Sequence, residues 1–287
     1  MKTIAKGHDL SIPINYFNLS YDDLGEGEVP VIFLHGFPFD KSMWSAQLEA
    51  LAPNYRVIAC DIRGFGKSID EVTSFSIDLF SMDLARFMNG IGVKKAIICG
   101  LSMGGYIALN FQKKYPELVE ALILCDTQCI SDANEVKQGR LKEIQEIEEF
   151  GPAKFNDKFV KKVFSEESLM TKKDLVSDLK RVVDANSTHI IAEGLRALSS
   201  RAETCTTLSE IRVPMLIICG REDKVTPLDQ SEYMHRATDG SFFRVIEKAG
   251  HVSNLEQPDI FNQHLKDFLE RVTEAKAEDS VAERSWF

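Results

Sequence analysis

A serine stands between glycines at the point where a predicted strand gives way to a predicted helix. The segment reads Gly100-Leu101-Ser102-Met103-Gly104-Gly105, after an apolar run at 96–99 and before a helix-like run at 106–109. Glycines leave room for strand and helix to approach closely at a turn that no larger residue would fit. Such a turn holds the serine hydroxyl above the sheet edge, where it can attack a carbonyl carbon. The spacing G-x-S-x-G in this context predicts a nucleophilic serine.

A serine hydroxyl is a poor nucleophile until a base takes its proton, so the chain must also supply an imidazole and a carboxylate. His251 follows the last predicted strand, in a loop that can carry it to the carboxyl edge of the sheet. Asp223 and Asp126 each follow a buried strand, and both are candidates for the carboxylate that orients the imidazole. We favour Asp223, because it gives the chain order serine, aspartate, histidine. The remaining histidines fit structural or solvated roles better: His8, His35, His189, His235 and His264.

The nucleophile also needs hydrogen-bond donors for the negative charge that develops on the attacked carbonyl oxygen. The N–H of Met103 is one candidate, helped by the positive end of the helix that follows. The N–H of Phe37 is the second, in the loop His35-Gly36-Phe37-Pro38 that ends an apolar strand. Gly36 lets the backbone turn there, and a simple turn without a catalytic role is the alternative interpretation. We therefore predict an oxyanion hole formed by Phe37 and Met103.

Alternating strands and helices must position these residues. Continuous apolar runs, typical of strands buried on both faces, occur at 29–34, 56–60, 96–99, 119–125, 213–220 and 242–246. Apolar residues at helical spacing follow several of them, at about 41–52, 77–91 and 258–269. Residues 11–20 alternate and predict an antiparallel edge strand, while Thr226 before Pro227 predicts the N-cap of a helix. The order predicts an α/β fold with a mostly parallel sheet and helices on both faces.

The pattern changes between residues 128 and 205, where strand-like runs give way to helical periodicity. Four apolar stripes predict four helices, and one stripe is rich in phenylalanine, with Phe155 and Phe159. We interpret residues 128–205 as a helical cap inserted into a core domain that comprises residues 1–127 and 206–287. Core packing accounts for much of the phenylalanine stripe, but a cap above an active site must also present apolar surface to a substrate.

Composition limits the partners. The 287 residues include 34 basic and 44 acidic side chains, a net charge of −10, without a basic stripe. We therefore expect no nucleic-acid partner. No apolar run approaches the ~20 residues of a membrane-spanning helix, and the N-terminus lacks the apolar core of a signal peptide. We expect a cytoplasmic protein without a membrane partner.

The sequence leaves the oligomeric state open, with a homodimer as one option. The charged stretch from about Thr273 predicts a frayed or disordered tail.

The cysteines show no metal-binding or redox spacing. The sequence has neither a C-x-x-C pair nor a histidine cluster at metal-ligand spacing, so we expect no metal and no cofactor. Four of the six cysteines end strand-like runs: Cys60, Cys99, Cys125 and Cys219. We interpret all six as buried free thiols. Cys125 and Cys129 are the only close pair, and we regard their proximity as incidental.

Several motifs resemble those of α/β-hydrolases, and the resemblance extends from about residue 10 to residue 270. The matching segments are HGFP at 35–38, DIRGFGKS at 61–68, GLSMGG at 100–105, GREDKVTP at 220–227 and GHVSNLEQP at 250–258. The resemblance implies a catalytic triad of Ser102, Asp223 and His251, with Phe37 and Met103 in the oxyanion hole. It also implies that the loop at 61–68 is architectural and braces the region near the oxyanion loop.

Within this family the chain resembles small-ester carboxylesterases and 3-oxoadipate enol-lactonase-like hydrolases, which share Ser-Met-Gly-Gly after the strand. The resemblance implies a serine hydrolase that cleaves small-molecule carboxylic esters through an acyl-enzyme, with an ester or lactone as substrate. An enol-lactonase or a carbon–carbon bond hydrolase on ring-cleavage products is the alternative, although the latter enzymes usually carry Asn where this chain has Leu101. Haloalkane dehalogenases and epoxide hydrolases use an Asp nucleophile, and Ser102 argues against both. A third hypothesis is a hydrolase-fold ligand sensor with little turnover.

Overall fold

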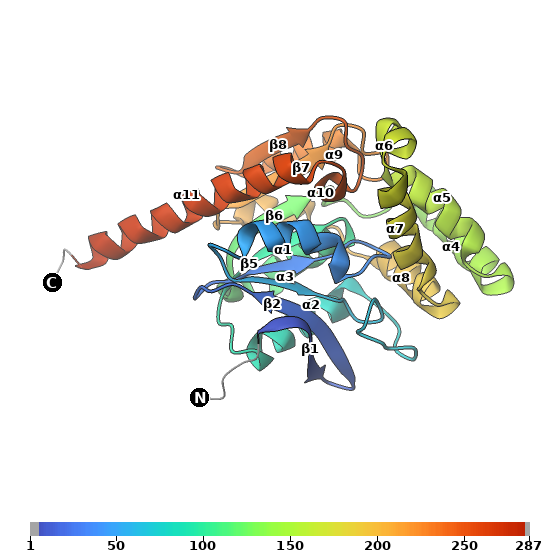
Figure 1. Cartoon of the computed structure of the whole chain (residues 1–287), viewed down its shortest axis with the longest axis horizontal. Coiled ribbons are helices and arrows are strands. Elements are labelled where there is room, and N and C mark those ends of the chain that lie inside the picture. Colours follow the sequence, from blue (N-terminus) through green and yellow to red (C-terminus); the bar gives the residue numbers. More distant parts are fainter. Residues whose placement is uncertain (1–5, 285–287) are drawn as a thin grey trace.

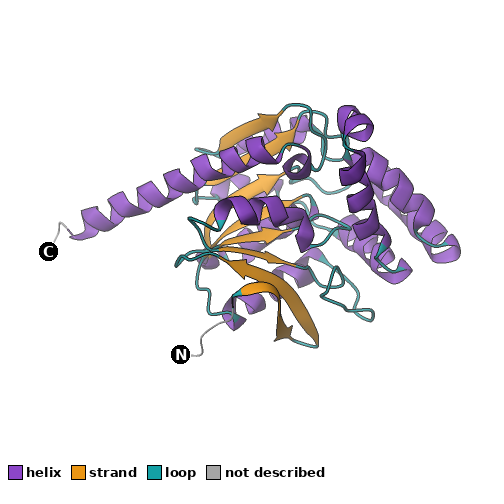
Figure 2. Cartoon of the chain, in the orientation of Figure 1, coloured by secondary structure: helices purple, strands orange, loops and turns teal. Residues whose placement is uncertain are grey.

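Eight strands form a single sheet in the computed structural model of the chain, which describes residues 6–284 (Figures 1 and 2). The strands are β1 (Gly7–Ile14), β2 (Phe17–Leu24), β3 (Val31–Leu34), β4 (Val57–Cys60), β5 (Ala96–Leu101), β6 (Val119–Cys125), β7 (Met215–Gly220) and β8 (Phe242–Ile246). Their order across the sheet is β1-β2-β4-β3-β5-β6-β7-β8. Every pairing from β4 to β8 is parallel, whereas β1 pairs with β2, and β2 with β4, in antiparallel fashion. The predicted α/β fold is confirmed.

Helices cover both faces of this sheet, because alternate residues of each parallel strand point to opposite sides. In β3, Ile32 and Leu34 belong to one hydrophobic cluster, while Val31 and Phe33 belong to the other. The first cluster includes residues of α2, α3 and α9, and the second includes residues of α1 and α11. These helices, with α10, are α1 (Ser45–Leu51), α2 (Ile77–Gly90), α3 (Met103–Lys114), α9 (Leu228–Ala237), α10 (Ser253–Glu256) and α11 (Pro258–Arg284).

A helical insertion separates β6 from β7 and lies at one end of the sheet (Figure 1). It contains α4 (Asn134–Phe150), α5 (Ala153–Val163), α6 (Glu166–Thr171), α7 (Lys173–Asp184) and α8 (Thr188–Ser200). The prediction of four helices is wrong by one, because α6 has only 6 residues and is too short to show an apolar stripe. Its start is fixed by a polar cap instead, since the Ser165 side chain accepts a hydrogen bond from the N–H of Ser168.

Three local predictions need correction. Residues 11–20 span two strands rather than one, because Asn15 takes a positive φ of 55° and reverses the chain in a hairpin. The helix expected over 41–52 begins as a 3₁₀ turn at Lys41–Trp44 before α1. The tail from about Thr273 continues as helix to Arg284 (Figure 1). Its sequence there is rich in Ala, Glu, Lys and Arg, which are strong helix formers.

The expectation for the cysteines is correct for Cys60, Cys99, Cys125 and Cys219, which are buried free thiols. It is wrong for Cys129 and Cys205, which form a disulfide across 76 residues of sequence. These two cysteines lie in the two connections between the sheet and the insertion. Their backbones run side by side, as the N–H of Thr204 donates to the carbonyl of Cys129 at 3.0 Å. In the described part of the chain, no helix has both the length and the apolar character that crossing a membrane requires.

Candidate active site

Ser102 occupies a strained turn between β5 and α3. Its φ of 55° and ψ of −114° lie in a region that non-glycine residues rarely adopt. Flanking glycines make this turn possible: a Cβ on Gly100 would lie 2.2 Å from the carbonyl oxygen of Gly104, and a Cβ on Gly104 would lie 2.2 Å from that of Leu34. The hydroxyl of Thr127, two residues after the end of β6, donates to the carbonyl of Ser102 at 2.8 Å and holds the turn. The local sequence thus forces the serine into the sharp strand-to-helix turn predicted for it.

The structure brings the three predicted polar side chains together at one edge of the sheet. Ser102 follows β5, Asp223 follows β7 and His251 follows β8, and the carboxyl ends of parallel strands meet at the same edge. The distance from Ser102 Oγ to His251 Nε2 is 2.8 Å, and the distance from His251 Nδ1 to Asp223 Oδ2 is also 2.8 Å. All three residues are buried, with 8% of Ser102 exposed. A hydroxyl, an imidazole and a carboxylate therefore form one continuous hydrogen-bonded chain.

Asp223 is held as a carboxylate by several donors. Its Oδ1 accepts from the N–H groups of Val225 at 2.7 Å and Thr226 at 3.0 Å, and its Oδ2 accepts from the Thr226 hydroxyl at 2.8 Å. Burial alone would raise the pKa of this carboxyl, but the charge of His251 and the hydrogen bonds of His251 and Thr226 outweigh it and lower the pKa. An ionised Asp223 accepts from Nδ1–H of His251, which leaves Nε2 free to accept the proton of Ser102.

Thr226 is a site residue that the sequence interpretation missed. We expected it to cap α9, but the helix begins at Leu228 after Pro227, without a side-chain cap. The Thr226 hydroxyl instead points at Asp223 and lies 3.3 Å from His251 Nδ1. Its position three residues after the candidate aspartate was the only signal in the sequence. A Ser or Thr that bonds a nearby carboxylate has the same pattern as a helix cap, so the two roles cannot be separated without coordinates.

The predicted oxyanion loop lies directly against the serine. A Cβ on Gly36 would lie 3.3 Å from the Ser102 Cβ and 3.0 Å from the Leu101 side chain, so a larger residue there would crowd the nucleophile turn. His35 fastens this loop: its Nε2 accepts from the N–H of Ile62 at 2.9 Å, and its Nδ1 donates to the Gly36 carbonyl at 2.8 Å. Burial lowers the pKa of His35, which keeps the ring neutral and able to make both bonds. His35 thus has the structural role expected of it.

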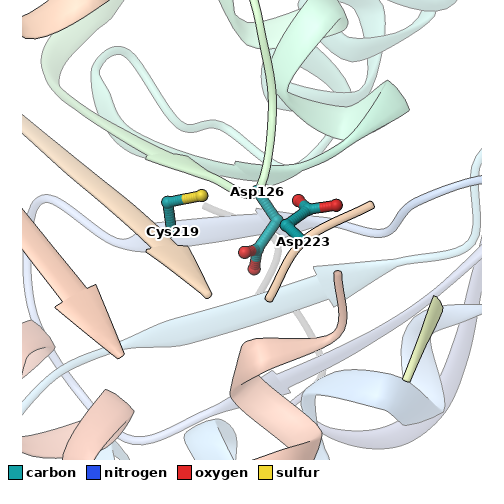
Figure 3. Close-up of side chains that lie close together, drawn as sticks. All are labelled: Asp126, Cys219 and Asp223. Atoms are coloured by element: carbon teal, nitrogen blue, oxygen red, sulfur yellow. The ribbon is translucent and has the colours of Figure 1, made fainter. Parts of the chain in front are cut away.

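The alternative carboxylate, Asp126, does not contact His251. Its Oδ1 accepts from the N–H of Gly220 at 2.7 Å, and its Oδ2 bonds the Ser253 hydroxyl at 2.5 Å. Figure 3 shows Asp126 and Asp223 close together, with Cys219 to one side, and their ligand atoms lie within 4.8 Å of one another. This trio does not suit a metal ion, because all four carboxylate oxygens already accept hydrogen bonds from the chain.

Burial, followed by the negative charge of Asp223, raises the pKa of Asp126 well above its usual range. Burial likewise raises the pKa of the Cys219 thiol. Two carboxylates cannot both ionise easily at this separation without a cation between them. Asp126 therefore keeps its proton to higher pH than a free aspartate does, and its side chain ties the end of β6 to β7 and to α10 beside Asp223.

Replacing Asp126 by asparagine is expected to make stability less dependent on pH. Because the pKa of Asp126 is higher in the folded protein than its unfolded value of 3.8, the folded state binds the proton more tightly. The contribution of Asp126 to the free energy of unfolding of the wild type is thus lost as pH rises from about 4 towards the pKa of Asp126 in the folded protein. Asparagine does not titrate, so the free energy of unfolding of Asp126→Asn minus that of wild type should increase from pH 4 to pH 7 in chemical denaturation. Parallel pH curves for wild type, Asp126→Asn and the exposed control Asp239→Asn would contradict a raised pKa of Asp126 in the folded protein.

A cavity of about 430 Å³ opens beside the nucleophile, within the usual size for small-molecule sites. Ser102 lies at the border of this cavity. The apolar wall of the cavity includes Phe37 and the predicted phenylalanine stripe of α5. The apolar lining residues include Phe37, Tyr106, Phe155, Phe159, Leu195 and Leu198, and the charged ones include Arg140, Glu143, Lys158, Lys162 and Asp229. The rings of Phe155 and Phe159 stack at 5.7 Å, and both lie about 6 Å from that of Phe37. The insertion and the core therefore share one aromatic wall.

Comparisons with known proteins agree with this geometry. The profile described as the alpha/beta hydrolase fold matches residues 29–258. The chain is 27% identical over 254 residues to 3-oxoadipate enol-lactonase 2 of Acinetobacter baylyi, covering 88% of this chain and 93% of that protein. It is 28% identical over 275 residues to a 2-hydroxy-6-oxononadienedioate/2-hydroxy-6-oxononatrienedioate hydrolase of a Pseudomonas species, covering 88% and 92%.

Among solved structures, a thermophilic esterase from Thermogutta terrifontis aligns with a TM-score of 0.87 and 30% identity, covering 92% of this chain and 98% of that one. The enol-lactonase from Burkholderia xenovorans aligns with a TM-score of 0.85 over 91% of this chain and 100% of its own, and at 24% identity it supports the fold alone. The family profile spans most of the chain, and the sheet, the glycine-flanked turn and the insertion have the expected places. The chain belongs to the α/β-hydrolase fold family.

Proposed function

We propose that this protein is a serine hydrolase that cleaves carboxylic esters of small molecules through an acyl-enzyme intermediate. The observation that carries the proposal is the hydrogen-bonded chain from Ser102 through His251 to Asp223, with both distances at 2.8 Å. Such a chain is what a serine hydroxyl needs to lose its proton during attack. Its position at the wall of a cavity gives a substrate access to the hydroxyl.

In the proposed mechanism, His251 Nε2 takes the proton of Ser102 as Oγ attacks the ester carbonyl carbon. The N–H groups of Phe37 and Met103 donate to the oxyanion of the tetrahedral intermediate. His251 then gives the proton to the leaving alcohol, and an acyl-Ser102 ester remains. A water molecule, deprotonated by His251, attacks this ester and releases the acid. Asp223 keeps the imidazole oriented and stabilises its positive charge throughout.

We also propose that residues 128–205 act as a cap that selects the substrate, over a core formed by 1–127 and 206–287. The cap contributes much of the cavity lining, including Phe155 and Phe159. An apolar wall of this kind favours an ester or lactone with an apolar acyl portion. Two relatives favour an enol-lactonase or a carbon–carbon bond hydrolase as the alternative activity, because one is a 3-oxoadipate enol-lactonase and the other a 2-hydroxy-6-oxononadienedioate/2-hydroxy-6-oxononatrienedioate hydrolase.

A substrate panel separates these activities. We expect kcat/KM for p-nitrophenyl esters to exceed that for an enol-lactone and for a vinylogous 1,5-diketone, and to fall once the acyl chain outgrows the cavity. The panel is measured with one enzyme preparation, and Ser102→Ala protein provides the background rate for every substrate. If the lactone or the diketone reacts roughly 100-fold faster than every ester, the ester assignment is wrong and the corresponding alternative replaces it.

A further inference from the structure

The loop that carries His251 is packed directly on the helical insertion. The N–H of His251 donates to the carbonyl of Val163 at 2.8 Å, so the histidine backbone is bonded to the end of α5. A Cβ on Gly250 would lie 2.8 Å from the nitrogen of Ser165 and from the carbonyl oxygen of Val163. Residues 163–165, which connect α5 to α6, therefore touch the histidine loop without intervening side chains. Figure 1 shows α6 at the end of the insertion nearest to α9 and α10.

Glu256, the last residue of α10, joins these two segments. Its Oε1 accepts from the N–H of Gly250 at 2.7 Å. Its Oε2 accepts from the N–H of Ser165 at 2.9 Å and from the Ser165 hydroxyl at 2.6 Å. The residue is 0% exposed, and a carboxylate is buried at acceptable cost only where donors replace its water. Charge-assisted bonds of this kind are stronger and shorter than bonds between neutral groups. One buried side chain thus binds the residue before His251 and the insertion at the same time.

Two ion pairs cross the same boundary at the surface. The Lys224 ammonium pairs with Glu166 at 3.1 Å, and Lys248 pairs with Glu167 at 3.3 Å. These side chains are at least half exposed, and exposed pairs contribute roughly 0–1 kcal/mol. The boundary is therefore held mainly by buried bonds, which are the His251 N–H to Val163 carbonyl bond and the three bonds that Glu256 accepts.

We propose that Glu256 is a positioning residue for hydrolysis: its carboxylate clamps Gly250 to Ser165 and so sets the place of the His251 imidazole. The inference rests on the proposed function, because it assigns His251 the role of the base. Glu256 is not among the residues that line the cavity, so it acts through His251 rather than through substrate contact. A displacement of about 1 Å in a catalytic group can cost roughly 10²-fold in rate. The clamp also couples the position of the insertion to that of the base.

Glu256→Gln tests this role, because glutamine keeps the size but turns an NH₂ group towards one of the two backbone donors. We expect kcat on a p-nitrophenyl ester to fall about 10- to 100-fold while KM changes less than about threefold. The rate at which a fluorophosphonate reacts with Ser102 should fall in parallel, since that reaction uses the same base. The matched control is Glu247→Gln, in which an exposed glutamate bonded to Arg221 is changed four residues before His251. Its kinetics should equal those of wild type.

A spectroscopic measurement tests the positioning without turnover. The proton between His251 Nδ1 and Asp223 Oδ2 should give a downfield ¹H NMR signal, which Glu256→Gln should displace and Glu247→Gln should leave in place. If Glu256→Gln does not fold, Ser165→Ala removes the hydroxyl donor to Glu256 together with the cap of α6, and its kcat should fall about three- to tenfold in folded protein. Ser187→Ala, which removes the side-chain cap of α8, is the control for loss of a cap and should leave kcat unchanged. A kcat within about twofold of wild type in the folded variant, with an unmoved signal, would overturn the proposal. Undiminished hydrolysis by Ser102→Ala would instead overturn the proposed function and leave the NMR test of Glu256 valid.

Discussion

Ser102→Ala is expected to lower kcat/KM for a p-nitrophenyl ester by about 10⁴-fold or more. The alanine side chain has no oxygen to form the acyl-enzyme, and the hydrogen bond from Oγ to His251 Nε2 is lost. Any residual rate would come from direct attack of water on the bound ester, with the oxyanion donors stabilising the negative charge that develops. Substrate affinity should change little, because the variant removes one small group from a cavity of about 430 Å³. Steady-state kinetics of purified wild-type and variant protein provide the measurement.

Ser131→Ala is the matched control for this variant. Ser131 also lines the cavity, and the described hydrogen bonds do not link it to an imidazole. Its removal should change kcat/KM by less than about fivefold. A Ser102→Ala protein with the same turnover as Ser131→Ala would show that the hydroxyl at 102 does not perform the chemistry. Unchanged melting temperatures in both variants would exclude misfolding as the cause of a loss.

Asp223→Asn is expected to lower kcat by roughly 10³- to 10⁴-fold, as loss of the orienting carboxylate does in serine hydrolases with such triads. The asparagine amide would favour a neutral His251 with its proton on Nε2, and that tautomer cannot accept the proton of Ser102. Because Asp223 also accepts bonds from Val225 and Thr226, the variant should retain its fold through the remaining amide oxygen. The measurement is kcat as a function of pH, together with the melting temperature.

Asp126→Asn is the matched control for Asp223→Asn. Both aspartates are buried at the ends of neighbouring strands, and both bond the loops that lead to the site. Since Asp126 bonds Gly220 and Ser253 rather than His251, and its raised pKa favours the uncharged form, its change to asparagine should cost less than about tenfold in kcat. The reverse result, a large loss for Asp126→Asn and a small one for Asp223→Asn, would exchange the two assignments.

Much of the fold followed from patterns that depend on local physics. The runs at 119–125 and 242–246 match β6 and β8 to the residue, because most of their side chains are apolar and pack against the helices that cover the sheet. The turn at Ser102 was also predictable, since only glycine fits where β5 and α3 approach. Chain order then favoured Asp223 over Asp126, and the structure places Asp223, not Asp126, at 2.8 Å from His251.

The remaining features depend on contacts between segments far apart in sequence. The disulfide of Cys129 with Cys205 requires the two ends of the insertion to lie side by side, which no spacing reveals. The clamp of Glu256 on Ser165 crosses 91 residues, and a single glutamate in a polar motif gives no sign that it is buried. The hairpin at Asn15 was hidden because apolar alternation continues across the turn to Tyr16, whose side chain is fully exposed.

The most direct test of the account is to find where the acyl group resides during turnover. Protein mixed with excess p-nitrophenyl acetate, quenched in acid and digested, should carry one acetyl group on the peptide that contains Ser102. The acetyl group should appear before steady state and should be absent from Ser102→Ala protein. Two results would contradict the mechanism. One is complete hydrolysis without an acetylated Ser102 peptide at any quench time. The other is an acetyl group on a different residue that forms and disappears at the catalytic rate.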